Sequence, residues 1–174
     1  MSTPKTDKCQ NATIAPEAGV DGSVPLATAP AKADRNRADV CVSTVMLDKS
    51  HFPIVNEKTL LKEALEEMSR LNLGIACLVN NEGILTGIIT DGDIRRKLLR
   101  TQKPFSAFFV DDAIDYAIRK PTIIASAQSL ASAVELMGQK QIWDLPVVSA
   151  DGRLEGLLHL HPAIEALLER LNYE

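Results

Sequence analysis

The hydrophobic and polar positions of this chain follow the same pattern twice. In the first copy, apolar residues at helical spacing are followed by a short apolar run, a polar turn, a second apolar run and a charged helical segment. The elements expected are a helix over 61–71, strands over 75–79 and 84–89, and a helix over 94–99. Because a short polar turn separates the two apolar runs, they predict a β-hairpin. We expect Asp91 or Asp93 to cap the helix that follows.

The pattern returns 69 residues later, with no gap needed between residues 61 and 94. Identical residues in the two copies are Leu61 and Leu130, Ala64 and Ala133, Met68 and Met137, Val79 and Val148, Gly83 and Gly152, Leu85 and Leu154, and Gly87 and Gly156. The second copy predicts a helix over 130–140, strands over 145–149 and 154–159, and a helix from Pro162, since proline is favoured in a first helical turn. One such unit buries too small a core to be stable alone, so the two are expected to cover each other's sheets.

The fold class expected is therefore α/β (α+β), with two β-α-β-β-α repeats packed with pseudo-two-fold symmetry. Residues 1–40 contain too little apolar surface to offset the entropy of ordering, and we expect a flexible tail there. The first repeat is expected over 41–100, a linker over 101–114 and the second repeat over 115–174. The apolar patch at 105–110 indicates a linker that packs or makes a contact.

Composition and charge exclude several classes of function. The net charge of -4, from 23 acidic and 19 basic residues, provides no positive field for nucleic acid. The N-terminal residues contain no apolar run that predicts a signal peptide or a membrane span, so we expect a cytoplasmic protein that contacts neither membrane nor nucleic acid. The three cysteines form no C-x-x-C pair and thus no zinc framework. No Ser-His-Asp order, P-loop or H-E-x-x-H motif is present, and no catalytic residue is assigned.

The strongest candidate for ligand chemistry is the string Gly-Ile-Ile-Thr-Asp-Gly-Asp at 87–93. A strand ends at Thr90, and the next helix presents free N–H groups to an anion, with Arg95 and Arg96 in its first turn. Such a corner suits a phosphorylated ligand. The alternative is that Asp93 only caps the helix and that the two arginines are solvated.

The duplicated unit with these strings resembles a pair of cystathionine-β-synthase (CBS) domains, the Bateman module. The strings at 87–96, 115–123 and 156–161 are similar to the C-terminal CBS pair of arabinose 5-phosphate isomerases. The sugar-isomerase domain of those enzymes is too large for the 40-residue tail, so we do not carry over their activity. The resemblance implies a tandem CBS pair that acts as a regulatory homodimer, with no required cofactor.

The resemblance also implies a ligand and a set of binding residues. The ligand expected is an adenine nucleotide (AMP, ADP or ATP) or a CMP-sugar such as CMP-Kdo, and the regulated partner a sugar-phosphate or sugar-nucleotide enzyme. In the family, the Thr position meets phosphate and the Asp position accepts from the ribose hydroxyls. The first-repeat site is expected to comprise Ile54, Ile75, Ala76, Thr90, Asp91, Asp93, Arg95 and Arg96.

The second repeat departs from this pattern, because His159 and Pro162 replace the Thr and the Asp. A candidate second site comprises Thr122, Ile142, Trp143, Leu145, His159 and His161. The two histidines could donate to a phosphate or a sugar acid, or they are simply polar residues at a turn. Two histidines are fewer than the three or four ligands that zinc needs, so no metal is expected.

Two further readings of function remain open. The chain could be a ligand-free structural or interaction module, in which the apolar linker patch recruits a partner. It could also be a regulatory fragment related to a sugar-phosphate isomerase.

Overall fold

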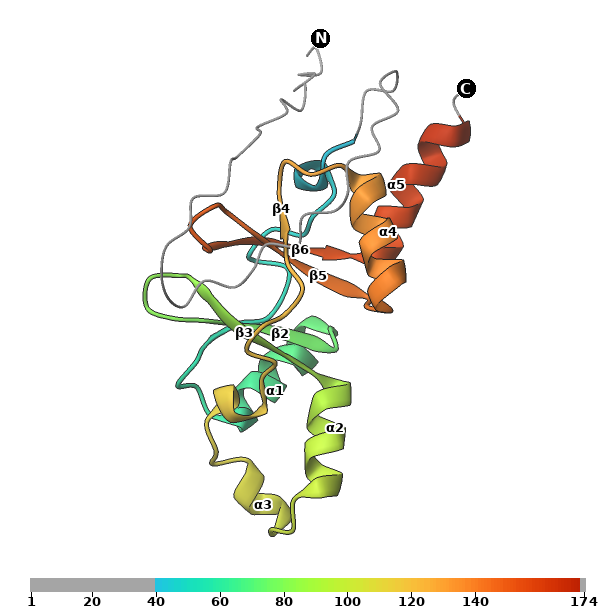
Figure 1. The fold of residues 1–174 in the computed structure, drawn as a ribbon. Helices are drawn as coiled ribbons and strands as arrows, with labels where there is room; N and C mark the ends of the chain where they lie inside the picture. Colours follow the sequence, from blue (N-terminus) through green and yellow to red (C-terminus); the bar gives the residue numbers. More distant parts are fainter. Residues whose placement is uncertain (1–39, 173–174) are drawn as a thin grey trace.

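The computed structural model describes residues 40–172, which form two three-stranded sheets, one above the other in Figure 1. The expected tail lies outside the described residues apart from Val40. The first sheet consists of β1 (Ile54–Asn56), β2 (Ile75–Val79) and β3 (Leu85–Thr90), and the second of β4 (Ile124–Ala125), β5 (Asp144–Val148) and β6 (Leu154–His159). The α-helices are α1 (Leu61–Leu71), α2 (Asp91–Arg100), α3 (Phe105–Phe108), α4 (Leu130–Lys140) and α5 (Leu160–Asn172). Short 3-10 helices, η1 (Val42–Thr44) and η2 (Ala113–Tyr116), precede β1 and β4.

The two sheets have the same topology, which confirms the mixed α/β fold and the duplicated β-α-β-β-α unit. In each sheet the first strand runs parallel to the second, and the second pairs antiparallel with the third. Parallel strands need a crossover connection, and α1 and α4 provide it. The hairpin turns also correspond. Gly83 and Gly152 have φ angles of 79° and 81°, in the left-handed region that glycine enters at no steric cost.

Two predicted helix starts need correction. The second-repeat helix begins at Leu160 rather than at Pro162, so the proline occupies the third helical position. Its missing N–H costs nothing there, because the first four N–H groups of a helix have no intrahelical partner. The prediction that Asp91 or Asp93 caps α2 is wrong, because the residue with extended backbone ahead of the helix is Thr90, whose side chain accepts from the N–H of Asp93.

Each sheet is extended by the segment that precedes the other repeat. The N–H of Leu47 donates to the carbonyl of Leu157 in β6 at 2.8 Å, and the N–H of Leu157 donates back at 3.1 Å. Ile118 exchanges the same pair of bonds with Ile88 of β3, at 2.8 and 3.1 Å. Thus the chain ahead of β1 completes the second sheet, and the chain ahead of β4 completes the first.

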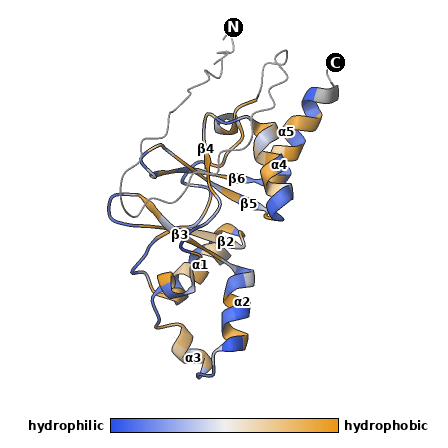
Figure 2. Cartoon of the chain, in the orientation of Figure 1, coloured by the Kyte–Doolittle hydropathy of each residue, from blue (hydrophilic) through white to orange (hydrophobic). Residues whose placement is uncertain are grey.

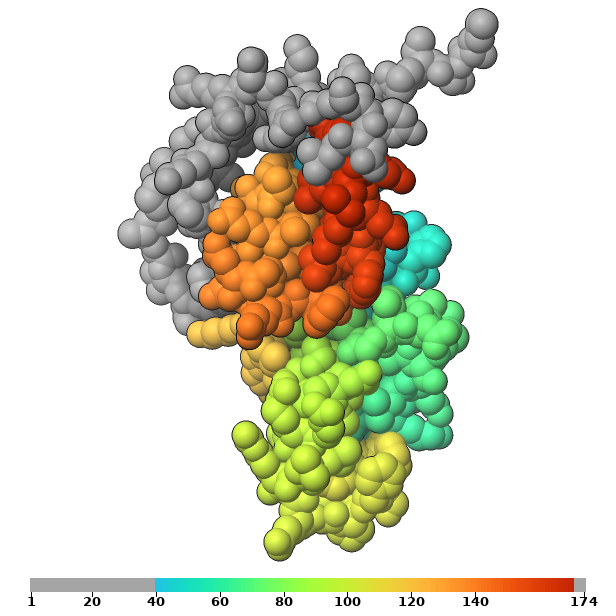
Figure 3. Space-filling model, turned by 90° about the vertical axis from the view of Figure 1, so that its right-hand side faces the viewer, coloured from blue at the N-terminus to red at the C-terminus, as the bar shows by residue number. Residues whose placement is uncertain are grey.

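Three apolar clusters hold the molecule together, one in each repeat and one between the two sheets. Along β2 the side chains alternate, so that Ala76 and Leu78 lie in the first repeat's own core whereas Ile75 and Cys77 face the other repeat. The buried members of the central cluster are Phe52, Ile75, Cys77, Leu85, Ile88, Ile123, Val148, Leu154 and Leu157. Because both sheet faces are covered, β2 is an uninterrupted apolar run, whereas β3, β5 and β6 also contain polar residues. Figure 2 accordingly shows orange segments in the sheets together with white and blue ones. In the space-filling view the two repeats abut directly (Figure 3).

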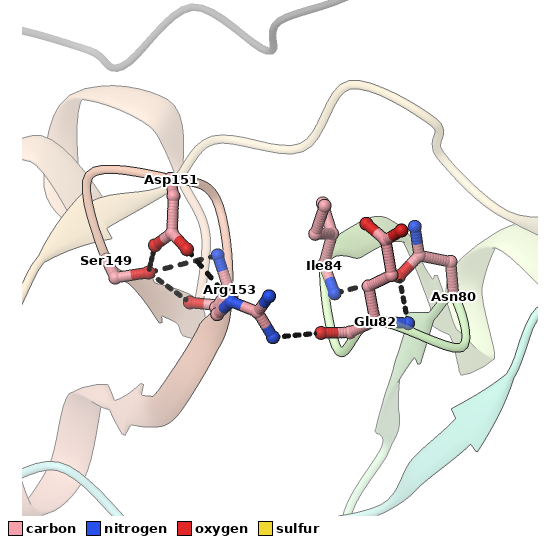
Figure 4. Close-up of polar contacts among 6 residues, drawn as sticks. All are labelled: Asn80, Glu82, Ile84, Ser149, Asp151 and Arg153. Atoms are coloured by element: carbon pink, nitrogen blue, oxygen red, sulfur yellow. Dashed lines mark hydrogen bonds and ion pairs between the residues drawn. The ribbon is translucent and has the colours of Figure 1, made fainter.

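The two hairpin turns contact each other across the pseudo-two-fold relationship. The N–H of Leu85 donates to the carbonyl of Gly152, and the N–H of Leu154 donates to the carbonyl of Gly83, each at 3.0 Å. Beside these bonds, the guanidinium of Arg153 donates to the carbonyl of Glu82 in the other turn and to the carboxylate of Asp151 in its own turn (Figure 4). The turns therefore form a second junction between the repeats, separate from the central cluster.

The linker packs onto the first repeat, as its apolar patch predicts. Phe108 is 3% exposed and lies in the first repeat's core, whereas Phe105 and Val110 are 65% and 70% exposed. Asp111 accepts from the Lys103 ammonium and from the Tyr116 hydroxyl, and these bonds lower the pKa of its carboxyl group. None of the helices within residues 40–172 has the length and apolar character needed to cross a membrane.

Candidate functional site

The corner at which β3 passes into α2 is built from a reciprocal pair, Thr90 and Asp93. The hydroxyl of Thr90 donates to Oδ2 of Asp93 at 2.5 Å and accepts from that residue's backbone N–H at 3.3 Å. Thr90 is thus the N-cap, and the carboxylate of Asp93, three residues later, accepts from its hydroxyl rather than from its backbone N–H as in a capping box. A carboxylate in the first turn also complements the positive end of the helix dipole.

Arg96 covers the same carboxylate from the solvent side. Its guanidinium donates to Oδ1 of Asp93, and the two side chains are 56% and 13% exposed. Gly92 gives the guanidinium room, because a Cβ there would lie 3.2 Å from Nη1 of Arg96. Both oxygens of Asp93 therefore accept hydrogen bonds within the corner, one from the neutral Thr90 hydroxyl and one from the guanidinium of the exposed Arg96 side chain.

Two of the apolar residues predicted for this site share a sheet face with Thr90, and one does not. Ile75 pairs with Thr90 in the β2–β3 register, and Ile54 pairs with Cys77. Ile54 and Ile75 belong to the central cluster, on the face that alternation also gives to Thr90. The side chain of Ala76 is fully buried on the opposite face, in the first repeat's core, so only its backbone lies beside Thr90 and Ile75.

The remaining predicted residues of the first repeat lie at the rim. Asp91 and Arg95 are exposed. The N–H of Asp91 donates to the carbonyl of Gly74 at 3.1 Å, and a Cβ on that glycine would lie 2.9 Å from a carboxylate oxygen of Asp91. An open hollow of about 350 Å³ lies beside them; its lining is Leu65, Met68, Ser69, Asn72, Leu73, Gly74 and Asp91. It touches Asp91 but neither Thr90 nor Asp93, so it is distinct from the corner.

In the second repeat, the structure brings three of the six predicted residues together and adds one that the sequence analysis missed. His159, His161 and Trp143 lie at the corresponding corner, and Asp144 Oδ1 lies 2.8 Å from His159 Nδ1. The 69-residue offset could have identified Asp144, because it aligns Asp144 with Ile75 and His159 with Thr90, and Ile75 and Thr90 are paired in the first sheet. Of the other predicted residues, Leu145 and Ile142 belong to the second repeat's core and Thr122 is half-buried.

The carboxylate of Asp144 in the second repeat lies near the thiol of Cys77 in the first. Burial raises the pKa of the Cys77 thiol, and the nearby carboxylate of Asp144 raises it further. The thiol is thus a buried neutral group rather than a nucleophile. Within residues 40–172, no group of three or more His, Cys, Asp or Glu side chains comes together as a metal site.

Fold and sequence define the class of this protein. The model of the CBS domain matches residues 42–100 and 113–169, which include the strands and main helices of both repeats. The chain therefore belongs to the CBS-domain family, and a CBS pair is generally a regulatory module.

Among curated relatives, the chain is similar to proteins that are about twice as long, and the match covers little more than a third of each of them. An uncharacterized protein of Helicobacter pylori is 32% identical over 121 residues, which cover 69% of this chain and 35% of that protein. The arabinose 5-phosphate isomerase KdsD of Pseudomonas aeruginosa is 35% identical over 135 residues, and the isomerase GutQ of Salmonella typhimurium 29% over 126. In both cases the match covers 72% of this chain and 37% of the enzyme.

Solved structures show the same fold. CBSX2 in complex with AMP is 24% identical, with a TM-score of 0.65 over 74% of this chain and 96% of that one. CBSX2 from Arabidopsis thaliana is 23% identical, with a TM-score of 0.66 over 77% of this chain and 98% of that one. These likenesses establish the tandem CBS pair as the architecture.

Proposed function

We propose that this chain is a non-catalytic regulatory module that binds a nucleotide or a nucleotide-sugar at the Thr90/Asp93 corner. The observation that carries the proposal is a hydroxyl, a carboxylate and a guanidinium gathered at the start of α2. The hydroxyl of Thr90 and the guanidinium of Arg96, at the positive end of the helix dipole, suit a phosphate. The carboxylate suits a pair of ribose hydroxyls, and Ile54 and Ile75 on the same sheet face suit a base.

In this proposal, ligand binding replaces contacts that the empty corner makes with itself. A phosphate is a strong acceptor for a guanidinium, so it draws Arg96 away from Asp93. Oδ1 of Asp93 then becomes available to the ribose. Because Thr90 and Ile75 are paired on strands that face the other repeat, occupancy changes how the repeats or two subunits pack. A coupling of about 1–3 kcal/mol is enough for such a signal.

Two classes of nucleotide are supported. The likeness to CBSX2, whose structure contains AMP, supports AMP, ADP or ATP. The similarity to the arabinose 5-phosphate isomerases supports a CMP-sugar such as CMP-Kdo. In either case we propose a cytoplasmic homodimer that regulates a sugar-phosphate or sugar-nucleotide enzyme and needs no cofactor of its own.

Isothermal titration of the full chain with AMP, ADP, ATP, CMP and CMP-Kdo tests the proposal. We expect at least one of these ligands to bind. Asp93→Ala should make its binding free energy less favourable by about 1.5–3 kcal/mol, the range for hydrogen bonds to a charged group. Glu66→Ala is the control, because Glu66 is an exposed carboxylate on α1 that pairs with Lys62. Absence of binding by all five ligands would overturn the proposal, and unchanged affinity of Asp93→Ala would limit Asp93 to helix capping.

A second candidate is an interaction module with no ligand, supported by exposed apolar side chains on and beside the linker. Leu99, Phe105 and Val110 are 82%, 65% and 70% exposed. If this is the function, the chain shows no response to nucleotides and still binds a sugar-nucleotide enzyme. Replacement of Phe105 and Val110 by Ser then abolishes that binding.

A further inference from the structure

Four side chains of the second repeat form a connected row where β6 passes into α5. Oδ1 of Asp144 lies 2.8 Å from Nδ1 of His159, and Nε2 of His159 lies 3.4 Å from Nδ1 of His161. The ring of Trp143 stacks on His161, with centroids 5.8 Å apart and planes 23° from parallel. The side chains of Asp144 and His159 are 18% and 28% exposed, whereas His161 is an exposed residue.

We propose that His159 and His161 together bind a divalent transition-metal ion of the zinc, nickel or copper class. Two imidazole nitrogens bound to one tetrahedral ion, each at 2.0–2.1 Å, lie about 3.3–3.4 Å apart. The two facing nitrogens are separated by 3.4 Å, which matches this spacing. A hydrogen bond from an N–H group is usually shorter, about 2.9–3.0 Å, so the gap suits a bridging ion better than a direct bond.

Asp144 prepares His159 for this role. Its carboxylate contacts the nitrogen of the ring that faces away from His161, and a carboxylate holds a proton on the nitrogen it contacts. The lone pair of His159 is then on Nε2, directed to His161. Carboxylate partners of this kind fix the ring orientation and raise the basicity of metal-binding histidines.

The row is peculiar to the second repeat and is not required by the fold. The first repeat adopts the same topology with Gly74, Ile75, Thr90 and Gly92 at the corresponding positions. An aromatic ring, a carboxylate and two imidazoles thus replace two glycines, an isoleucine and a threonine. Such a concerted change supports a chemical role rather than a packing role.

The site provides two protein ligands and leaves the other positions open. No third His, Cys, Asp or Glu joins the pair among residues 40–172, so water or an oxygen of a small molecule completes the coordination. The exposure of His161 gives an ion access to the pair. The expectation of no metal rested on counting ligands in the sequence, and the spacing and the Asp144 contact are what the structure adds.

Titration of the full chain with nickel chloride, in a buffer that does not chelate metals, tests the proposal. Calorimetry is expected to show one ion per chain, and binding is expected to quench the fluorescence of Trp143, the chain's single tryptophan. His161→Ala should raise the Kd at least tenfold, and Asp144→Asn tenfold to a hundredfold, the usual effect of losing a carboxylate partner. His51→Ala is the matched control, because His51 lies 2.9 Å from Asp48 but is not paired with a second histidine.

Absence of both heat and quenching in the wild-type chain would overturn the proposal, as would stoichiometric binding that survives the double change His159→Gln and His161→Ala. If Asp144→Asn perturbs folding, the exposed His161 still decides the outcome. The proposal is independent of the nucleotide site, because its probe is the metal alone and its variants lie outside the first repeat. Loss of the metal site therefore leaves nucleotide binding at Thr90/Asp93 unchanged.

Discussion

Thr90 and Asp93 hold each other through two hydrogen bonds, and this pairing links the stability of α2 to the chemistry of the candidate site. The threonine hydroxyl accepts from the backbone of Asp93 and donates to its carboxylate. A ligand that forms a hydrogen bond with the Thr90 hydroxyl or the Asp93 carboxylate must leave the N-cap of α2 intact or replace the bond that it breaks. The same two residues therefore affect both unfolding and binding.

Replacing Thr90 by Val removes the N-cap of α2 and the partner of Asp93. We expect a loss of about 0.5–2 kcal/mol in the free energy of unfolding, measured by urea denaturation, because an N-cap satisfies an otherwise unpaired N–H. Nucleotide affinity is expected to fall as well. Ser129→Ala is the control, since Ser129 caps α4 by accepting from Ser132 and lies at no candidate site. Equal nucleotide affinity of the two variants would contradict a ligand role for Thr90.

Arg96→Ala should affect two kinds of ligand in opposite directions. The affinity for a nucleotide falls about tenfold or more, because a charged hydrogen bond to phosphate is lost. The corresponding nucleoside binds equally or more tightly, because Oδ1 of Asp93 is no longer occupied by the guanidinium. Stability changes by less than about 0.5 kcal/mol, as for other exposed helix pairs. Arg100→Ala provides the charge-matched control, because Arg100 is exposed in the last turn of the same helix. Equal losses of affinity for the nucleotide and the nucleoside in Arg96→Ala would argue against the exchange.

Gly156→Ala tests the segment that completes the second sheet. A Cβ at this position would lie 2.7 Å from the carbonyl oxygen of Leu47, and this backbone atom is fixed by its bond to Leu157. Overpacking of this kind costs about 1–3 kcal/mol in unfolding free energy. In contrast, Gly138→Ala in α4 meets nothing within 4 Å and should stabilise the chain by about 0.5–1 kcal/mol. A neutral effect of Gly156→Ala would show that the segment ahead of β1 moves freely.

Asp111 should make the linker sensitive to acid. Its bonds to Lys103 and Tyr116 lower its pKa below the ordinary value of 3.8, so its contribution to stability is complete above that value. The contribution is lost as the pH falls through the lowered pKa. The difference in unfolding free energy between the wild type and Asp111→Asn should therefore be smaller at pH 3 than at pH 7. Asp112→Asn, at the exposed neighbouring position, is the control, and a difference that is constant with pH would contradict the assignment.

Much of the fold could be predicted from the sequence, because local patterns determine it. Alternating helical and strand periods located both hairpins, and the 69-residue offset identified the duplication. The N-cap of α2 was misassigned because threonine and aspartate both suit caps, and only the backbone conformation of Thr90 distinguishes them. Local patterns also cannot show which sheet the segments at Leu47 and Ile118 join, because that pairing is formed between distant parts of the chain.

The candidate site was predicted in part. Thr90, Asp93 and Arg96 come together because each lies three residues, about one helical turn, after the one before it. The resemblance alone does not tell on which face of β2 the side chain of Ala76 lies, and the structure places it on the face opposite Thr90. Asp144 was overlooked because its significance depends on its pairing with His159 across a hairpin.

The segments at Leu47 and Ile118 each pair with the sheet of the other repeat. The smallest unit with both sheets complete is therefore the pair of repeats, not the single repeat. A cut between residues 100 and 101 would separate each sheet from the backbone that closes its edge. Recombination that moves one copy into another protein would therefore leave two open sheet edges, which are prone to aggregation. A transplanted module therefore needs both repeats to keep its sheet edges closed.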